Sequence, residues 1–311
     1  MSDGGFELIV AQADREFMGS PLREQPDKPF YHYTGPGGLE GILGKGAIWA
    51  TDYRGLNDDE ELTRGENAIT AELDAIIGEH DDNTPLGDLA RRVRGLRDGH
   101  RVIDIPNIGI YVTSFSTEPE LSHQWDHYAD HGKGYAIGFK SLPLPTGNPT
   151  PQRLELGLSV DFGYCLYDEA QYRKLVREII LFVASGLEKY CEYYAKNEAQ
   201  VESLVRTARI CALARLGASV WFLKRPSFEG ESELRLVQIG APPEQPQERQ
   251  VDGRAVKFIE IDIRKDGCLD LYEIMAGPAE PSAKPDGYLK SVMDRSGYEH
   301  VKLSRSRLTY P

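Results

Sequence analysis

The sequence predicts a compact, mixed α+β fold. Short segments in which apolar residues alternate with small or polar ones recur along the chain and are typical of half-buried strands. Between them lie segments whose apolar residues repeat at helical spacing, and one long block has helical spacing only. Strands with helices scattered among them favour an α+β architecture.

The first expected strand covers residues 30–34, where the preceding prolines favour an extended chain. Gly35-Pro36-Gly37-Gly38 then makes a turn, and a short helix follows until Gly44 and Gly46 stop it. Residues 108–116 alternate as a half-buried strand does. Further strands are expected at 48–51, 158–164, 231–239, 257–263, 271–275, 135–139 and 301–304.

The expected helices have recognisable starting points. Residues 58–61 are acidic and precede a long apolar repeat, which suits a helix cap and the helix dipole. Residues 167–216 have the pattern of two long amphipathic helices that divide near residue 196. We therefore expect a tail over residues 1–29, with at most one short helix, and a single domain over residues 30–311. That domain carries a helical insertion at about residues 168–216.

Composition limits the classes of function. The chain has 311 residues, 40% hydrophobic and 27% charged, which is enough for a sizeable core. A formal net charge of −13 disfavours extended nonspecific contact with nucleic acid or an anionic membrane. Four cysteines without a C-x-x-C pair indicate reduced thiols, and no apolar run approaches the roughly 20 residues of a membrane helix. Together with the lack of a basic and apolar leader, these features predict a cytoplasmic protein without membrane contact.

Three polar clusters carry candidate chemistry. Tyr31-His32-Tyr33-Thr34 combines an imidazole with stacking rings and a hydroxyl, which suits a ribose and a flat pyridinium ring. The second cluster joins Ser114 and Ser116, which share one strand face, to Trp125 and Tyr128 on a short helix. The third is Glu231-Ser232-Glu233-Leu234-Arg235, whose charged side chains would share one face of a strand.

In these clusters the chain resembles a bacterial family catalogued as a domain of unknown function, from residue 30 to the C-terminus. It is similar, more distantly, to the ADP-ribosyltransferase superfamily, through its His-Tyr-Thr strand, the helix with a glycine-bounded end and the late Glu-x-Glu strand. The residues that carry the family resemblance are His32-Tyr33-Thr34, Ile42-Leu43, Ile48-Trp49-Ala50-Thr51, Leu56-Asn57-Asp58 with Glu61-Leu62, Ser114-Phe115-Ser116, Trp125, Tyr128, Gly134, Ile137-Gly138-Phe139, Lys224, Phe228, Glu231 to Arg235, Gly277-Pro278 and Ser304.

The superfamily resemblance implies a split mixed sheet and NAD as the substrate. It also implies that His32 contacts the nicotinamide ribose, that an aromatic residue stacks on nicotinamide, and that a late-strand glutamate holds the ribose 2′-hydroxyl. Cleavage of the nicotinamide–ribose bond builds an oxocarbenium-like centre, which a nearby carboxylate stabilises without a metal. Arg235 either binds a pyrophosphate through its bidentate fork or holds one glutamate in place.

The predicted catalytic residues are Glu233, Glu231 and His32. Glu233 is narrowly favoured as the catalytic carboxylate, and Glu231 would orient an acceptor. The predicted substrate-binding residues are Tyr33, Thr34, Tyr53, Asn57, Ser114, Ser116, Trp125, Tyr128 and Arg235.

No metal is expected. His123 and His127 have the i, i+4 spacing of a zinc site, but nothing nearby completes it and His131 falls beyond the helix end, so surface histidines are favoured. Residues 57–60 offer oxygen ligands for Mg²⁺, although a helix cap explains them better. The glycine-rich turn at residues 35–38 lacks the frame of a phosphate loop or a Rossmann motif.

The leading hypothesis is an NAD-dependent ADP-ribosyltransferase-like enzyme or NAD glycohydrolase, used in stress or phage defence. Its acceptor stays open among a protein, a nucleic acid, a small molecule and water. A second hypothesis is a non-catalytic nucleotide-sensing or partner-binding module that keeps the pocket without turnover. A third is a nucleic-acid-processing enzyme with His and Glu as acid and base, which the acidic balance disfavours.

Overall fold

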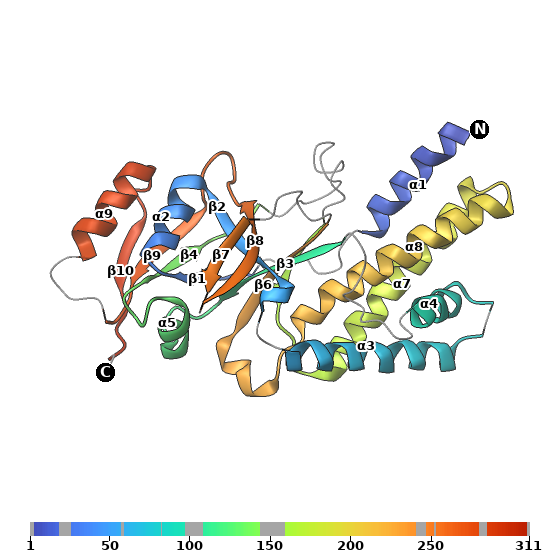
Figure 1. Ribbon diagram of the computed structural model, residues 1–311, viewed down its shortest axis with the longest axis horizontal. Coiled ribbons are helices and arrows are strands. Elements are labelled where there is room, and N and C mark those ends of the chain that lie inside the picture. The colour runs from blue at the N-terminus through green and yellow to red at the C-terminus, as the bar shows by residue number, and fades with distance from the viewer. Residues whose placement is uncertain are drawn as a thin grey trace.

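The computed structural model describes residues 3–18, 26–56, 59–81, 83–96, 108–143, 159–240, 247–251, 253–279 and 285–309. Within these ranges the chain is mixed α+β, with a ten-stranded sheet and a bundle of helices beside one end of it (Figure 1). The expected fold class is confirmed at this level.

The described strands follow one pairing order, β10-β9-β4-β1-β3-β2-β8-β7, and β3 also pairs with β6, which pairs with β5. The sheet is mixed because β9 and β10 are parallel, whereas the other described pairs are antiparallel. The strands are β1 (Phe30–Thr34), β2 (Ala47–Asp52), β3 (Gly109–Ser116), β4 (Tyr135–Phe139), β5 (Ser159–Tyr164), β6 (Glu233–Gly240), β7 (Gln247–Val251), β8 (Arg254–Asp262), β9 (Leu271–Ala276) and β10 (Lys302–Arg305).

The sheet is split along one edge of β3. On its other edge β3 pairs with β6 over its whole length, from Gly109 to Ser116. On the split edge, β1 reaches β3 only at Ser116, and β2 reaches it only at Tyr111 and Val112. Two arms therefore diverge from this edge: the β1 arm (β1, β4, β9 and β10) and the β2 arm (β2, β8 and β7).

The expected helical block is confirmed as α7 (Glu169–Tyr194) and α8 (Glu198–Ser219). The side chains of Asp168 and Asn197 cap these helices by accepting hydrogen bonds from backbone N–H groups in the first turn. The block is larger than expected, because α3 (Asp59–Glu79) and α4 (Pro85–Leu96) pack into the same apolar core.

The N-terminal segment differs from the expected tail. Residues Asp3–Phe17 form the helix α1, which packs against α7 and α8 (Figure 1). Phe6 and Phe17 are buried in the core of the bundle. The segment looked polar in sequence because only one narrow face of the helix is apolar, and the partner that covers this face lies far along the chain.

A second apolar core lies between the sheet and two helices, α2 (Pro36–Lys45) and α9 (Pro285–Ser296). The helix α2 begins directly after β1, with Pro36 in its first turn, and ends at Gly46, whose φ of 67° suits glycine. The strand and the helix expected from residue 30 onward are confirmed. The turn expected at residues 35–38 is not, because the helix already begins at Pro36 and includes Gly37 and Gly38.

Two further expectations concern the membrane and the thiols. Across the described ranges, no helix combines the length and the apolar character that a membrane crossing requires. All four cysteines are free, and Cys165 and Cys211 are buried.

A buried ion pair joins the bundle to the sheet. Arg215 on α8 donates a hydrogen bond from Nη1 to Asp161 Oδ1 on β5, at 2.6 Å. Both side chains are almost fully buried, with 1% and 0% of their surface exposed. Since water cannot replace either partner, removal of one charge leaves the other buried and uncompensated.

We expect Arg215→Met to lower the free energy of unfolding by about 3–5 kcal/mol, because Asp161 then lies buried without its positive partner. Urea unfolding followed by circular dichroism measures this loss. Arg206→Met is the matched control on the same helix, since Arg206 is exposed. The control should change the free energy by no more than about 0.5 kcal/mol. Equal stability of the two variants would contradict the ion pair as a link between the bundle and the sheet.

Candidate functional site

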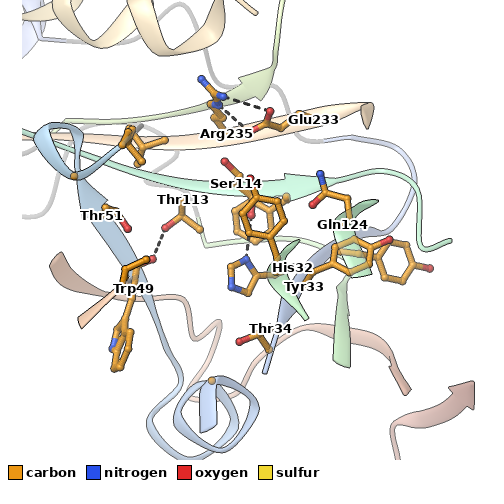
Figure 2. A pocket seen from close by; sticks show the side chains of 18 of the residues that line it. His32, Tyr33, Thr34, Trp49, Thr51, Thr113, Ser114, Gln124, Glu233 and Arg235 are labelled. Carbon is orange, nitrogen blue, oxygen red and sulfur yellow. Dashed lines mark hydrogen bonds and ion pairs between the residues drawn. The ribbon is translucent and has the colours of Figure 1, made fainter. Parts of the chain in front are cut away.

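A pocket of about 630 Å³ opens where the β1 arm and the β2 arm diverge (Figure 2). Its walls come from both arms, from β3 and β6, and from α2, so it collects residues from distant parts of the chain. Small-molecule sites commonly have volumes of roughly 300–1,000 Å³. Among the predicted site residues, those that line the pocket are His32, Tyr33, Thr34, Ser114, Tyr128, Glu231, Glu233 and Arg235.

His32 is fixed in one orientation and one tautomer. Its Nδ1 lies 3.0 Å from the carbonyl oxygen of Ser114, so Nδ1 carries the proton and donates it to that oxygen (Figure 2). The other ring nitrogen, Nε2, is left as an acceptor. Burial lowers the pKa of His32 and the positive charge of Arg249 lowers it further, although the bond to Ser114 acts in the opposite direction. The ring is therefore neutral at physiological pH.

Tyr33 and Thr34 follow His32 on β1. Tyr33 is buried, donates its hydroxyl to the backbone oxygen of Glu118 at 2.7 Å and packs edge-on against Trp125. Thr34 lies against Gly38, where an added Cβ would come within 1.9 Å of the threonine Oγ1. Only glycine at this position lets α2 approach β1 so closely.

The wall formed by α2 is open because of its glycines. Gly37, Gly38 and Gly41 line the pocket. An added Cβ at Gly37 or Gly41 would meet no atom within 4 Å, so both positions face empty space. A helix with larger side chains here would fill part of the volume that a ligand needs.

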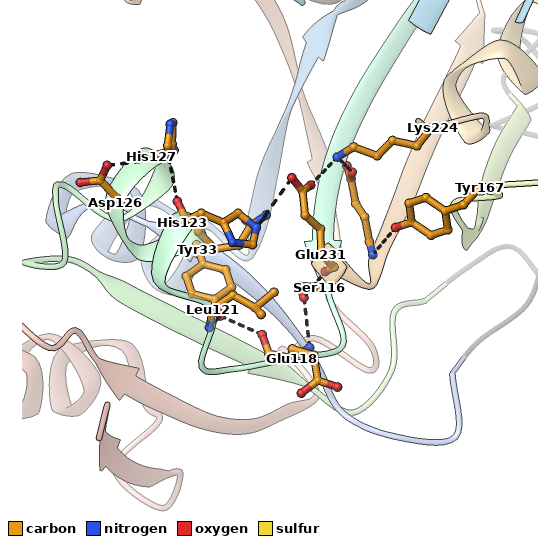
Figure 3. Close-up of polar contacts among 12 residues, drawn as sticks. Tyr33, Ser116, Glu118, Leu121, His123, Asp126, His127, Tyr167, Lys224 and Glu231 are labelled. Atoms are coloured by element: carbon orange, nitrogen blue, oxygen red, sulfur yellow. Dashed lines mark hydrogen bonds and ion pairs between the residues drawn. The ribbon is translucent and has the colours of Figure 1, made fainter. Parts of the chain in front are cut away.

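The opposite end of the pocket holds an ionic cluster of Lys224, Glu231, Glu233, Arg235 and Glu61. Lys224 Nζ donates hydrogen bonds to the carboxylates of both Glu231 and Glu233 (Figure 3). Arg235 donates from Nε to Glu233 Oε1 at 2.8 Å and from Nη1 to Glu61 Oε2 at 3.1 Å. Three carboxylates and two cations leave the cluster with a formal surplus of one negative charge.

Glu233 is the buried centre of this cluster. Burial raises the pKa of its carboxyl, but the charges and hydrogen bonds of Arg235 and Lys224 outweigh burial and lower the pKa to about 2. The pKa of Lys224 is raised, since its two glutamates outweigh burial and the repulsion of Arg235. Glu233 therefore stays ionised, and both of its oxygens accept hydrogen bonds from the cations.

Glu231 has a different environment. Its side chain is 14% exposed, compared with 5% for Glu233, and its Oε1 lies 3.7 Å from His123 Nε2 (Figure 3). Within the described part of the chain, no hydrogen bond reaches that oxygen. Glu231 is therefore the carboxylate with an oxygen available to a ligand.

The expected strand at residues 231–239 begins two residues later than predicted. Glu231 ends a 3-10 turn (Pro226–Glu231), Ser232 has a φ of 46°, and β6 starts at Glu233. The two carboxylates consequently meet through Lys224 and not through the two-residue period of a strand. Arg235 is engaged by Glu233, Glu61 and the backbone oxygen of Trp221, so it holds the glutamate in place.

Three predicted binding residues lie outside the pocket. Trp125 is fully buried and packs on Tyr33, and Tyr53 is buried in the bundle core, 6.0 Å from the ring of Trp221. Ser116 uses its hydroxyl within the protein, donating to Glu231 O and accepting from the backbone of Glu118. A fourth predicted residue, Asn57, falls outside the described residues.

The histidines at 123, 127 and 131 do not converge. His127 contacts the backbone oxygen of His123, whereas His131 lies beyond the end of α5 (Ser122–Tyr128) and contacts Asp126. Among the residues that the structure describes, no three His, Cys, Asp or Glu side chains are grouped as metal ligands.

The pocket also contains residues that were not assigned to the site from the sequence. They include Glu61, Lys224, Trp49, Thr51, Thr113, Gln124, Trp221, Phe228 and Arg249. Lys224 and Trp49 were among the residues on which the expected family resemblance rested, which was a signal that they act together with the other residues. Arg249 gave no such signal, because its strand β7 showed no clear strand pattern.

Comparison with known proteins is informative for one segment. The family model described as "Protein of unknown function (DUF2971)" matches residues 124–236. The matched segment includes Tyr128 and the cluster residues Lys224, Glu231, Glu233 and Arg235, and it excludes β1. No curated protein and no solved structure matches the chain.

The low pKa of Glu233 makes the stability of the fold depend on pH. Because its folded pKa of about 2 lies below the ordinary value of 4.5, the ionised carboxylate stabilises the fold above about pH 4.5. This contribution, on the order of 3 kcal/mol, is lost as the pH falls toward the folded pKa. In urea unfolding at stepped pH, Glu233→Gln should therefore differ most from the wild type near neutral pH and least near pH 2. Glu229→Gln, at an exposed position nearby, should follow the wild type throughout. If the difference in the free energy of unfolding between wild type and Glu233→Gln did not change with pH, this carboxylate would be ruled out as the source of the pH dependence.

Proposed function

We propose that the chain is an NAD-dependent enzyme of the ADP-ribosyltransferase type, which cleaves the nicotinamide–ribose bond. One observation carries the proposal: His32 and the carboxylates Glu231 and Glu233, about 200 residues apart in sequence, line one pocket at the split of the sheet. A split sheet with this pair of residue types at the split is what the superfamily resemblance implies. The proposal extends to the fold, which would be of the ADP-ribosyltransferase type.

The ionic cluster suits the charge that develops during this reaction. Departure of nicotinamide leaves positive charge on the ribose, and a fixed negative environment lowers the energy of that state. The cluster has a surplus of one negative charge and is held rigid by Lys224 and Arg235. No metal enters the proposed reaction.

The roles that we propose for the two glutamates differ from those assigned from the sequence. Both oxygens of Glu233 already accept hydrogen bonds from cations, so we assign it to the positioning of Lys224. Glu231 keeps one oxygen for a ribose hydroxyl and is the carboxylate that we propose contacts the substrate. Neutral His32, with its Nε2 as an acceptor, would bind a second ribose hydroxyl.

Two exposed rings are available for the flat parts of NAD. Tyr128 is 61% exposed and Trp49 is 40% exposed, and both line the pocket. Stacking of a base on such a ring typically contributes about 1–3 kcal/mol. We propose a cytoplasmic location, in stress or phage defence, and an acceptor that is a protein, a nucleic acid, a small molecule or water.

We expect Glu231→Gln to reduce the rate of nicotinamide release by about 10²–10³, because the amide keeps the shape but removes the charge near the ribose. Glu229→Gln, in the same turn but exposed and outside the pocket, is the matched control and should keep full activity. Nicotinamide release is followed by chromatography, with melting temperatures to verify folding. Full activity of Glu231→Gln would refute its assignment as the substrate-contacting carboxylate. Tight NAD binding by the wild type without any release, with and without cell extract as a source of acceptor, would favour the nucleotide-sensing module.

Gly41→Leu should block the pocket without harming the helix. The new side chain enters the empty space beside α2, so NAD binding measured by calorimetry should be lost. The helix itself should gain up to about 1 kcal/mol, since glycine is a poor helix former. Gly44→Leu makes the same change about one turn further along the helix, at an exposed position that does not line the pocket and where no atom lies within 4 Å either, and should leave binding intact. Unchanged NAD binding in Gly41→Leu would place the ligand elsewhere.

A further inference from the structure

Arg249 is a cation in the pocket that lacks an acidic partner. It lies on β7, lines the pocket, and forms no ion pair with any residue in the described ranges. Its Nε is buried and has no hydrogen-bond partner there. Buried charges in proteins are normally paired, because the loss of hydration is otherwise uncompensated.

The β2 arm holds this guanidinium in position. Arg249 Nη2 donates to Thr51 Oγ1 at 3.0 Å, and the guanidinium carbon lies 5.5 Å from the centre of the Trp49 ring. Phe258 supports the tryptophan, with the two ring centres 4.4 Å apart. The nearby carboxylate of Glu260 is already bonded to Lys45 and to Trp49 Nε1. The guanidinium is thus oriented by neutral neighbours, and its charge remains unmatched.

The effect of burial on Arg249 supports this interpretation. Burial alone lowers the pKa of Arg249, with no neighbouring carboxylate acting against it. By contrast, carboxylates raise the pKa of Arg235, which is more deeply buried than Arg249. The positive charge of Arg249 reaches His32, whose pKa it lowers. The free protein gains little from such a charge, which is typical of a group retained for a ligand.

Charge is therefore distributed unevenly along the pocket. Figure 2 shows Trp49 and Thr51 on one wall and Glu233 with Arg235 on another. The first wall has the unpaired cation Arg249, and the second has the surplus negative charge of the ionic cluster. A ligand that matches both would carry an anionic group and a centre that becomes cationic.

We propose that Arg249 binds a phosphate or pyrophosphate group of the ligand and so selects phosphorylated over uncharged compounds. This inference rests on the proposed function, in which the pyrophosphate of NAD faces Arg249 and its ribose faces Glu231. The planar guanidinium has two N–H edges suited to phosphate oxygens, and the buried Nε–H belongs to one of them.

The test compares the full-length wild type with Arg249→Met, Arg249→Lys and Lys257→Met. Lys257 lies on the adjacent strand β8 and pairs with Glu248, the residue before Arg249, so it occupies the opposite face. Its substitution removes the same charge without touching the pocket. Calorimetry measures binding of NAD, ADP-ribose, inorganic pyrophosphate and adenosine, and nicotinamide release is measured in parallel.

Arg249→Met should weaken the binding of ADP-ribose and pyrophosphate by about tenfold to a hundredfold, the usual range for loss of a charged hydrogen bond. The affinity for adenosine should not change, which separates lost phosphate recognition from a collapsed pocket. The affinity of Arg249→Lys for ADP-ribose and pyrophosphate should lie between those of the wild type and Arg249→Met, because lysine keeps the charge but lacks the two-pronged guanidinium. Without ligand, Arg249→Met should melt no lower than Lys257→Met.

The remaining outcomes separate this inference from the proposed function. If the wild type releases nicotinamide while Arg249→Met binds ADP-ribose as tightly as the wild type does, the inference is overturned and the proposed function stands. If pyrophosphate binds through Arg249 but NAD does not bind, the anion site is supported and the proposed function fails. If no phosphorylated compound binds the wild type, both are overturned.

Discussion

The pocket exists because two strands share one edge of β3 and leave the middle of that edge unpaired. Two strands of the same sheet pair with this edge at its two ends, β1 at Ser116 and β2 at Tyr111 and Val112. Neither covers the residues between, so His32 reaches the backbone of Ser114 by its side chain and Thr113 reaches Trp49 in the same way. The split is thus stabilised by side-chain bonds where strand pairing is missing, and the missing strand pairing creates the space for a ligand.

The ionic cluster depends on the same edge indirectly. β6 runs along the full opposite edge of β3 and places Glu233 at Ser116, near the end where β1 joins. Lys224 precedes the turn before β6, which brings its ammonium back to both carboxylates. Removal of any one residue of the cluster changes the electrostatic environment of the others. Effects on positioning and on catalysis at this end of the pocket can therefore be separated only with matched variants.

The two ends of the pocket illustrate two uses of a buried charge. Arg235 is buried with carboxylates that raise its pKa, and it contributes to the order of the site in the free protein. Arg249 lies partly buried among neutral groups, burial lowers its pKa, and under our proposal its charge becomes matched only when an anion binds. Stability measured without ligand and affinity measured with it therefore test different halves of the site.

The sequence by itself determined the local elements and the residue types of the site. Glycine stops, acidic caps and alternating apolar residues act over a few positions, which is why β1, α2, β3, α7 and α8 were predicted near their observed bounds. The grouping of His32 with the late glutamates was an expectation from the resemblance to the ADP-ribosyltransferase superfamily, which no comparison supports. These signals need no knowledge of distant contacts.

Only the tertiary structure decided which side chains face the pocket. Trp125 and Tyr53 turn into apolar cores, because packing and not spacing sets the direction of a large ring. The turn at Ser232 places Glu231 outside the strand, and Lys224 supplies the contact that strand geometry would have supplied. Arg249 and the packing of α1 depend on partners about 200 residues away in the chain, Thr51 and α8, which no local pattern specifies.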